Sequence, residues 1–161
     1  MADLPRVSFW VCLVLIPLGG LFHLIGFASP YWIKVGTVHG GIWRICTKVC
    51  TDYVDFPGSL PGYLLATQFF ETVGLIAIGA AAVLLFLSIF VEALKGKKII
   101  TIINALACFG ACGAIIVGAI IYGSRLLYYF SWAFALCIVG AIMEGVAGAL
   151  LIVGTFATRR T

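Results

Sequence analysis

The 161-residue sequence is far more apolar than that of a water-soluble protein. Hydrophobic residues make up 63% and charged residues 10% of it, against about 45–50% and about 25% in soluble domains. Its mean hydropathy is +1.20, more than a soluble fold of this length can bury. The formal charge of +4 is too small and too scattered for nucleic acid to be a partner. These values exclude a soluble enzyme, a disordered chain and a secreted disulfide scaffold, and they indicate an integral membrane protein.

Four stretches are long enough to cross a bilayer, which takes about 20 apolar residues: residues 7–28, 64–94, 99–122 and 131–157. Ser29-Pro30 ends the first, because a residue before proline disfavours the helical region. The apolar run of that span is longer than the about 7–15 residues of a signal-peptide core, so we expect a retained anchor. The fold class predicted is a membrane all-α fold. It is one four-helix transmembrane domain over residues 1–161.

The lysines and arginines predict the orientation, since they favour the cytoplasmic side. Six would lie on the side of the termini and of the turn at residues 95–98, and four on the other side. We therefore expect a multi-pass plasma-membrane protein with both termini cytoplasmic. Its outer side would carry a long loop, residues 29–63, and a short one, residues 123–130.

The long outer loop is predicted to contain strands. Residues 31–50 are rich in β-branched and aromatic types and are interrupted by Gly40-Gly41, a pattern typical of strands joined by a turn. Cys46 and Cys50 would face each other across a three-residue hairpin loop, and a disulfide is expected there in the oxidising outer environment. A zinc or redox site at this C-x3-C pair is the alternative. We expect the cysteines within the spans to be small buried apolar groups: Cys12, Cys108, Cys112 and Cys137.

A short motif in this loop carries a family resemblance. Trp32, then Gly41-Ile42-Trp43, then Cys46 and Cys50, all between the first two spans, resemble the W…G-L-W…C…C signature of the claudin superfamily. This superfamily includes peripheral myelin protein, the epithelial membrane proteins, the lens fibre membrane protein and calcium-channel γ-subunits. Ile42 stands where the family usually has leucine, and the cysteine spacing and second outer loop are shorter than in claudins proper.

The resemblance implies a small extracellular antiparallel β-sheet on the four-helix bundle. In the family, Trp32 and Trp43 would insert the sheet into the outer mouth of the bundle, and the disulfide would brace two strands. From the residues alone, the alternative is that both tryptophans belong to the aromatic belt of the membrane interface.

The function implied is that of a claudin-like structural protein of cell–cell contacts such as tight junctions. It would lie in the lipid bilayer, assemble with itself or related tetraspan proteins, and adhere or seal through its first outer loop. An auxiliary subunit of a channel or receptor and a paracellular pore are the alternatives. The chain ends in Arg159-Arg160-Thr161, without the apolar terminal residue of a PDZ ligand, so no PDZ partner is expected.

Three ionisable residues fall within the predicted spans: His23, Glu71 and Glu144. By helical rise, His23 and Glu71 both lie about 10 Å below the outer surface, so they could pair across the first two helices. We expect interhelical hydrogen bonds for all three, with a proton or ion relay as the alternative.

Small residues recur at a spacing of four in the last two spans, where they predict close helix packing, with association of copies as the alternative. They are Gly110, Ala114 and Gly118 in the third and Cys137, Ala141, Gly145 and Ala149 in the fourth. No catalytic constellation or phosphate-binding glycine loop is present in the sequence. We therefore expect no enzyme activity, no cofactor and no metal ion.

Overall fold

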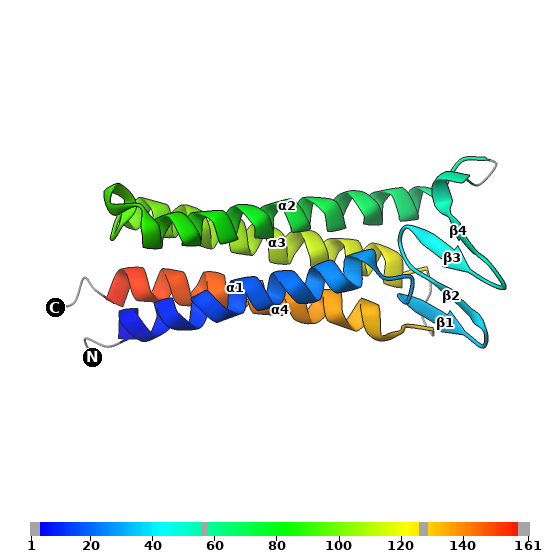
Figure 1. Cartoon of the computed structure of the whole chain (residues 1–161), viewed down its shortest axis with the longest axis horizontal. Coiled ribbons are helices and arrows are strands. Elements are labelled where there is room, and N and C mark those ends of the chain that lie inside the picture. Colours follow the sequence, from blue (N-terminus) through cyan, green and yellow to red (C-terminus); the bar gives the residue numbers. More distant parts are fainter. Residues whose placement is uncertain (1–3, 56–57, 126–128, 158–161) are drawn as a thin grey trace.

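A computed structural model describes residues 4–55, 58–125 and 129–157. These residues form four long helices that run side by side, with a small sheet at one end (Figure 1). All four helices are long and apolar enough to cross a membrane. They are α1 (Leu4–Ala28), α2 (Gly62–Phe90), α3 (Lys98–Gly123) and α4 (Trp132–Ala157).

The helix ends agree with the sequence prediction except at the end of the second span. α1 ends directly before Ser29-Pro30, as predicted. α2 ends at Phe90, not at Leu94, because Val91 is extended and a separate 3-10 turn, η2 (Glu92–Leu94), follows it. The chain must leave the axis of α2 before so short a turn can start an antiparallel helix. Gly96, with φ of +71°, then reverses the chain into α3.

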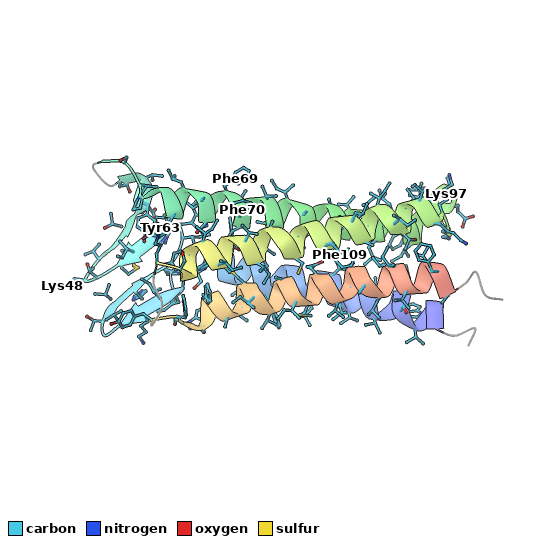
Figure 2. The ribbon with its side chains drawn as sticks, turned by 180° about the vertical axis from the view of Figure 1, so that it is seen from behind. Lys48, Tyr63, Phe69, Phe70, Lys97 and Phe109 are labelled. Atoms are coloured by element: carbon cyan, nitrogen blue, oxygen red, sulfur yellow. A yellow bond between two sulfur atoms is a disulfide. The ribbon has the colours of Figure 1, made fainter. Side chains whose placement is uncertain are left out.

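The turn between α2 and α3 lies at the same end of the molecule as the helix ends nearest the two termini (Figure 1). The sheet lies at the opposite end. Figure 2 shows the same arrangement from behind, with Lys48 at the tip of the sheet and Lys97 at the far end.

The helices contact one another most extensively where α1 packs against α4 and α2 against α3, and glycines allow a close approach in both places. A Cβ on Gly140 of α4 would meet the carbonyl oxygen of Gly19 on α1, and one on Gly74 of α2 would meet Ile115 of α3. The predicted small-residue faces correspond only in part to these contacts. Gly118 and Ala141 are buried, but Gly110 and Ala149 are exposed, because a spacing of four drifts around a helix of 3.6 residues per turn.

The sheet has four short antiparallel strands in chain order: β1 (Ile33–Val35), β2 (Val38–Gly40), β3 (Arg44–Cys46) and β4 (Cys50–Asp52). β2 ends at Gly40 and the connection to β3 begins at Gly41, where the sequence pattern predicted the break between strands. A second turn, at residues 36–37, joins β1 to β2, and Gly36 has a φ of +58° there. Beyond the free edge of β1, Phe130 forms a bridge with Ile33, which ties the entry to α4 to the sheet.

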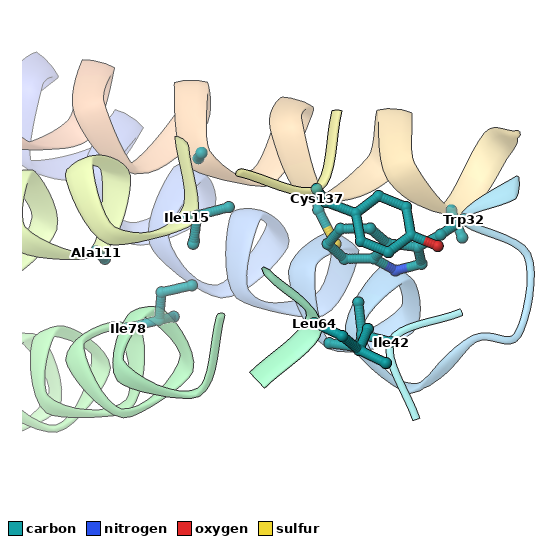
Figure 3. Close-up of a cluster of buried hydrophobic side chains, with 10 residues drawn as sticks. Trp32, Ile42, Leu64, Ile78, Ala111, Ile115 and Cys137 are labelled. Carbon is teal, nitrogen blue, oxygen red and sulfur yellow. The ribbon is translucent and has the colours of Figure 1, made fainter. Parts of the chain in front are cut away.

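The buried side chains form two clusters along the bundle. One lies beneath the sheet and extends to mid-bundle, as shown in Figure 3, where Trp32, Ile42 and Leu64 lie near one end and Ile78 and Ala111 near the other. The second fills the far half with aliphatic side chains and thiols: Cys12, Ile16, Ala81, Leu85, Ala105, Cys108, Ala147 and Leu151.

Candidate functional site

Trp32 fixes the sheet to the helices. Its side chain is fully buried, and its Nε1 donates a 2.8 Å hydrogen bond to the carbonyl oxygen of Gly26 in the last turn of α1. Its ring stands edge-on to those of Tyr122 on α3 and Phe134 on α4, with centroids 5.0 and 5.5 Å apart. Its backbone carbonyl accepts a bond from the amide of Ser131, directly before α4. One residue therefore connects three helices to the sheet.

Ile42 is the second residue of the loop that enters the bundle, in place of Trp43. Ile42 is fully buried, and Gln68 Nε2 of α2 donates a 2.6 Å hydrogen bond to its carbonyl oxygen. Trp43 is 37% exposed, and its ring packs edge-on against Phe27. The family-based expectation for Trp43 is therefore wrong in its depth: the side chain lies at the rim of the mouth. Both residues lie in the connection between β2 and β3, and the path of that connection turns Ile42 inward.

We call the side chains of Trp32, Ile42, Tyr122 and Phe134 the mouth cluster. Gly41 allows it to form, because a Cβ at this position would collide with the carbonyl oxygen of Ser29. The loop can therefore pass directly over the end of α1, and the Gly41 amide donates to the carbonyl of Arg44 at 2.9 Å. The glycine of the motif serves this close backbone approach.

The predicted disulfide between Cys46 and Cys50 is present. The two cysteines are paired in the register of β3 and β4 across residues 47–49, as the spacing predicts. Sulfur atoms joined in this way are not thiolate ligands, so the disulfide argues against the zinc alternative. Arg44 and Asp52, also opposite each other on these strands, form an exposed ion pair at 2.9 Å.

The sheet exposes apolar side chains at its outer surface. Val49 is 73% exposed in the β3–β4 hairpin and Val54 is 87% exposed just after β4. Next to Val54, burial raises the pKa of the Tyr53 phenol, with a smaller contribution from Tyr63, so Tyr53 remains protonated at neutral pH. On the β1 side, Tyr31 stacks on His39 with ring centroids 4.2 Å apart.

His23 and Glu71 come together between α1 and α2, as predicted. Both side chains are fully buried, and His23 Nδ1 lies 3.6 Å from Glu71 Oε2. His23 Nε2 lies 3.2 Å from the carbonyl oxygen of Glu71. The sequence did not predict that Cys137 of α4 joins them, with its Sγ, a ring nitrogen of His23 and a carboxyl oxygen of Glu71 all within 4.8 Å of one another.

Glu144 is fully buried nearer the middle of the bundle. By distance and angle neither of its carboxyl oxygens accepts a hydrogen bond among the described residues, but its carboxyl group interacts with the Cys108 thiol of α3, so its interhelical contact is with a thiol. Its neighbours include Gly19 of α1 and Cys108 of α3. The predicted intramembrane polar residues therefore divide into one pair, His23 with Glu71, and Glu144, which lies beside the Cys108 thiol.

The sequence analysis missed two residues that the structure brings to these groups: Gln68 at the Ile42 carbonyl, and Cys137 at His23 and Glu71. Gln68 lies one turn before Glu71 on the same helix, and its position between two apolar stretches could have signalled an inward-facing amide. Cys137 gave no such signal, because a cysteine among small residues on one helix face indicates only close helix packing.

No family model matches the chain, and no match was found among curated proteins.

Proposed function

We propose that the protein is a claudin-like multi-pass membrane protein that acts at cell–cell contacts, with its sheet outside the cell and both termini in the cytoplasm. The observation that carries this proposal is the attachment of the sheet to the ends of four apolar helices by buried side chains. Trp32 and Ile42 fix the base of the sheet, and the disulfide fixes its outer hairpin. A loop held at both ends in this way can present the same surface to a neighbouring cell without a large loss of entropy on binding.

The exposed surface of the hairpin supports an adhesive role. Lys48 lies at the tip of the sheet (Figure 2). Val49, the next residue, is apolar and 73% exposed. An exposed apolar side chain on a disulfide-closed hairpin has a low entropic cost of ordering and gains from burial against a partner. We infer that the hairpin contacts a second copy, or a related tetraspan protein, on the apposed cell.

The orientation proposed follows the lysines and arginines. The turn with Lys95, Lys97 and Lys98 lies at the end opposite the sheet. With the sheet outside the cell, all three lysines lie on the cytoplasmic side, which basic residues favour. The outer side is then the oxidising one, where the Cys46–Cys50 disulfide persists.

A mixed-cell experiment tests this proposal. Cells that express the protein with one fluorescent tag are cultured with cells that express it with a tag of a second colour and with cells that lack the protein. We expect enrichment at borders where both cells express it. The variant Val49→Asp should lose this enrichment, because a charge replaces the apolar tip, and Val49→Ile should keep it. Equal signal at borders with non-expressing cells would overturn adhesion between copies.

An auxiliary role with a channel or receptor is the second candidate. The observation in its favour is the shortness of the second outer segment, since only residues 124–131 separate α3 from α4. Claudin-like adhesion would be expected to use two outer loops, and an auxiliary subunit needs no contact across cells. Capture of one channel or receptor from cells grown without neighbours, undiminished by Val49→Asp, would favour this role.

A further inference from the structure

We propose that His23, Glu71 and Cys137 form a zinc site buried among α1, α2 and α4. The side chains of all three residues are fully buried, and their donor atoms lie within 4.8 Å of one another. They supply nitrogen, oxygen and sulfur, the three donor types that bind Zn²⁺ in proteins. The inference stands independently of the adhesive role.

The hydrogen bond of the imidazole leaves one ring nitrogen available. Nε2 lies 3.2 Å from the carbonyl oxygen of Glu71, and because a carbonyl only accepts, the ring proton is assigned to Nε2. Nδ1 then carries a lone pair directed toward the Glu71 carboxyl group. Metal-binding histidines are commonly oriented in this way, by a bond from the second ring nitrogen to a carbonyl.

The gap between the imidazole and the carboxyl group fits a shared cation better than a direct bond. Nδ1 and Oε2 are 3.6 Å apart, whereas a charged imidazole–carboxylate bond is about 2.7–2.9 Å long. Among the described residues, neither Nδ1 nor either Glu71 oxygen has a hydrogen-bond partner. Two ligands of one tetrahedral zinc ion, each about 2.0–2.1 Å from it, lie about 3.3–3.5 Å from each other.

Charge balance selects a divalent ion. A neutral imidazole, one carboxylate and one thiolate carry two negative charges, which Zn²⁺ cancels, and an uncompensated charge in this apolar interior would be costly. Cys137 Sγ lies 3.9 Å from the carbonyl oxygen of His23, a contact too long to fix the thiol in place, and a metal ion that binds the sulfur would displace its proton. Three protein ligands leave the fourth tetrahedral position to another donor.

A glycine on a neighbouring helix lies against each of the three side chains. A Cβ on Gly118 of α3 would lie 2.7 Å from Glu71 Oε1, one on Gly26 of α1 would meet Cys137 Sγ, and one on Gly140 of α4 would lie 3.2 Å from the Cβ of His23. These glycines let the three donors approach one point. Adding a methyl group at Gly118 should displace the carboxyl group without removing a ligand.

The test measures metal in the full chain, purified in detergent micelles from cells grown with added zinc. We expect about one zinc per chain by mass spectrometry, as for one mononuclear site. Cys137→Ser, His23→Gln and Glu71→Gln should each lower this at least about fivefold, since each removes one of three ligands. Gly118→Ala should lower it less. Cys112→Ser and Glu144→Gln are the matched controls and should retain the zinc.

Growth with cobalt in place of zinc provides a second readout. Wild type should show the visible bands of tetrahedral Co²⁺ and a near-ultraviolet thiolate-to-cobalt band. Cys137→Ser should lose the thiolate band, and Cys112→Ser should keep it. A folded wild-type protein without zinc or cobalt would overturn the site and leave a metal-free His23–Glu71 pair. Equal zinc in wild type and folded Cys137→Ser would equally overturn it.

Discussion

The half of the bundle beneath the sheet and the half at the far end are built from similarly apolar helices but have different interiors. Beneath the sheet, the mouth cluster packs large rings around a hydrogen-bonded tryptophan, and His23 lies against Glu71. Toward the far end, the core has no buried aromatic ring among the described residues of its cluster and is filled by aliphatic side chains and the thiols of Cys12 and Cys108, next to Glu144. The comparison indicates that specific contacts are concentrated where the helices must hold the sheet.

Replacing Trp32 should give the largest difference in stability between a substitution beneath the sheet and one at the far end. Trp32→Ala removes a fully buried ring and its hydrogen bond, and we expect a loss of about 3–5 kcal/mol in the free energy of unfolding. Trp10→Ala is the control, because Trp10 of α1 is 60% exposed toward the far end and should change stability by less than about 0.5 kcal/mol. Unfolding in mixed detergent micelles measures both. Similar losses for the two variants would contradict the comparison.

A glycine substitution in the α1–α4 contact should have the next largest effect. Gly140→Ala places a methyl group against the backbone of Gly19 and His23, which cannot move aside easily, so we expect a loss of up to about 3 kcal/mol. Gly148→Ala in the far half meets the Ala105 carbonyl at 3.1 Å and side chains that can shift, and should cost about 1 kcal/mol. Gly113→Ala, with nothing within 4 Å, is the control and should be neutral or slightly stabilising.

Removing the disulfide should affect the sheet and leave the helices intact. For so short a loop, the chain-entropy model gives about 2 kcal/mol, all of it local to the β3–β4 hairpin. Cys46→Ser with Cys50→Ser should therefore speed amide exchange in the hairpin and leave the helical circular dichroism melting curve unchanged. In the wild-type protein, without reductant, a thiol reagent should label neither cysteine. Labelling of both would show that the disulfide is absent.

Replacing the two buried carboxyl groups should give the smallest difference in stability between the two halves. Glu71→Leu removes the 3.6 Å electrostatic contact of its carboxyl group with His23 Nδ1, which is too long for a hydrogen bond, and should cost about 1–3 kcal/mol. Glu144→Leu removes only a contact with the Cys108 thiol and should cost at most about 1–2 kcal/mol, with Glu144→Gln close to wild type. Thermal unfolding in micelles compares the variants. A larger loss for Glu144→Leu than for Glu71→Leu would reverse the ranking.

The sequence by itself determined the elements that depend on local chemistry. The apolar lengths predicted four helices, Ser29-Pro30 predicted the end of α1, and the spacing of Cys46 and Cys50 predicted their pairing across a hairpin. Helical rise placed His23 and Glu71 at one depth, and they are in contact. Each of these predictions depends on residues a few positions apart in the sequence or on the number of residues along one helix axis.

Only the tertiary structure decided which side chains face one another. Rotation about a helix axis is not set by its own sequence when all sides are apolar, so the approach of Cys137 to His23 and the contact of Glu144 with Cys108 were not predictable. The family resemblance likewise implied that Trp43 enters the bundle, and the structure places Ile42 there. The loop is held in this path by the close approach of Gly41 to the Ser29 carbonyl oxygen and by the hydrogen bond from Gln68 to the Ile42 carbonyl, and both contacts join segments that the sequence alone does not place side by side.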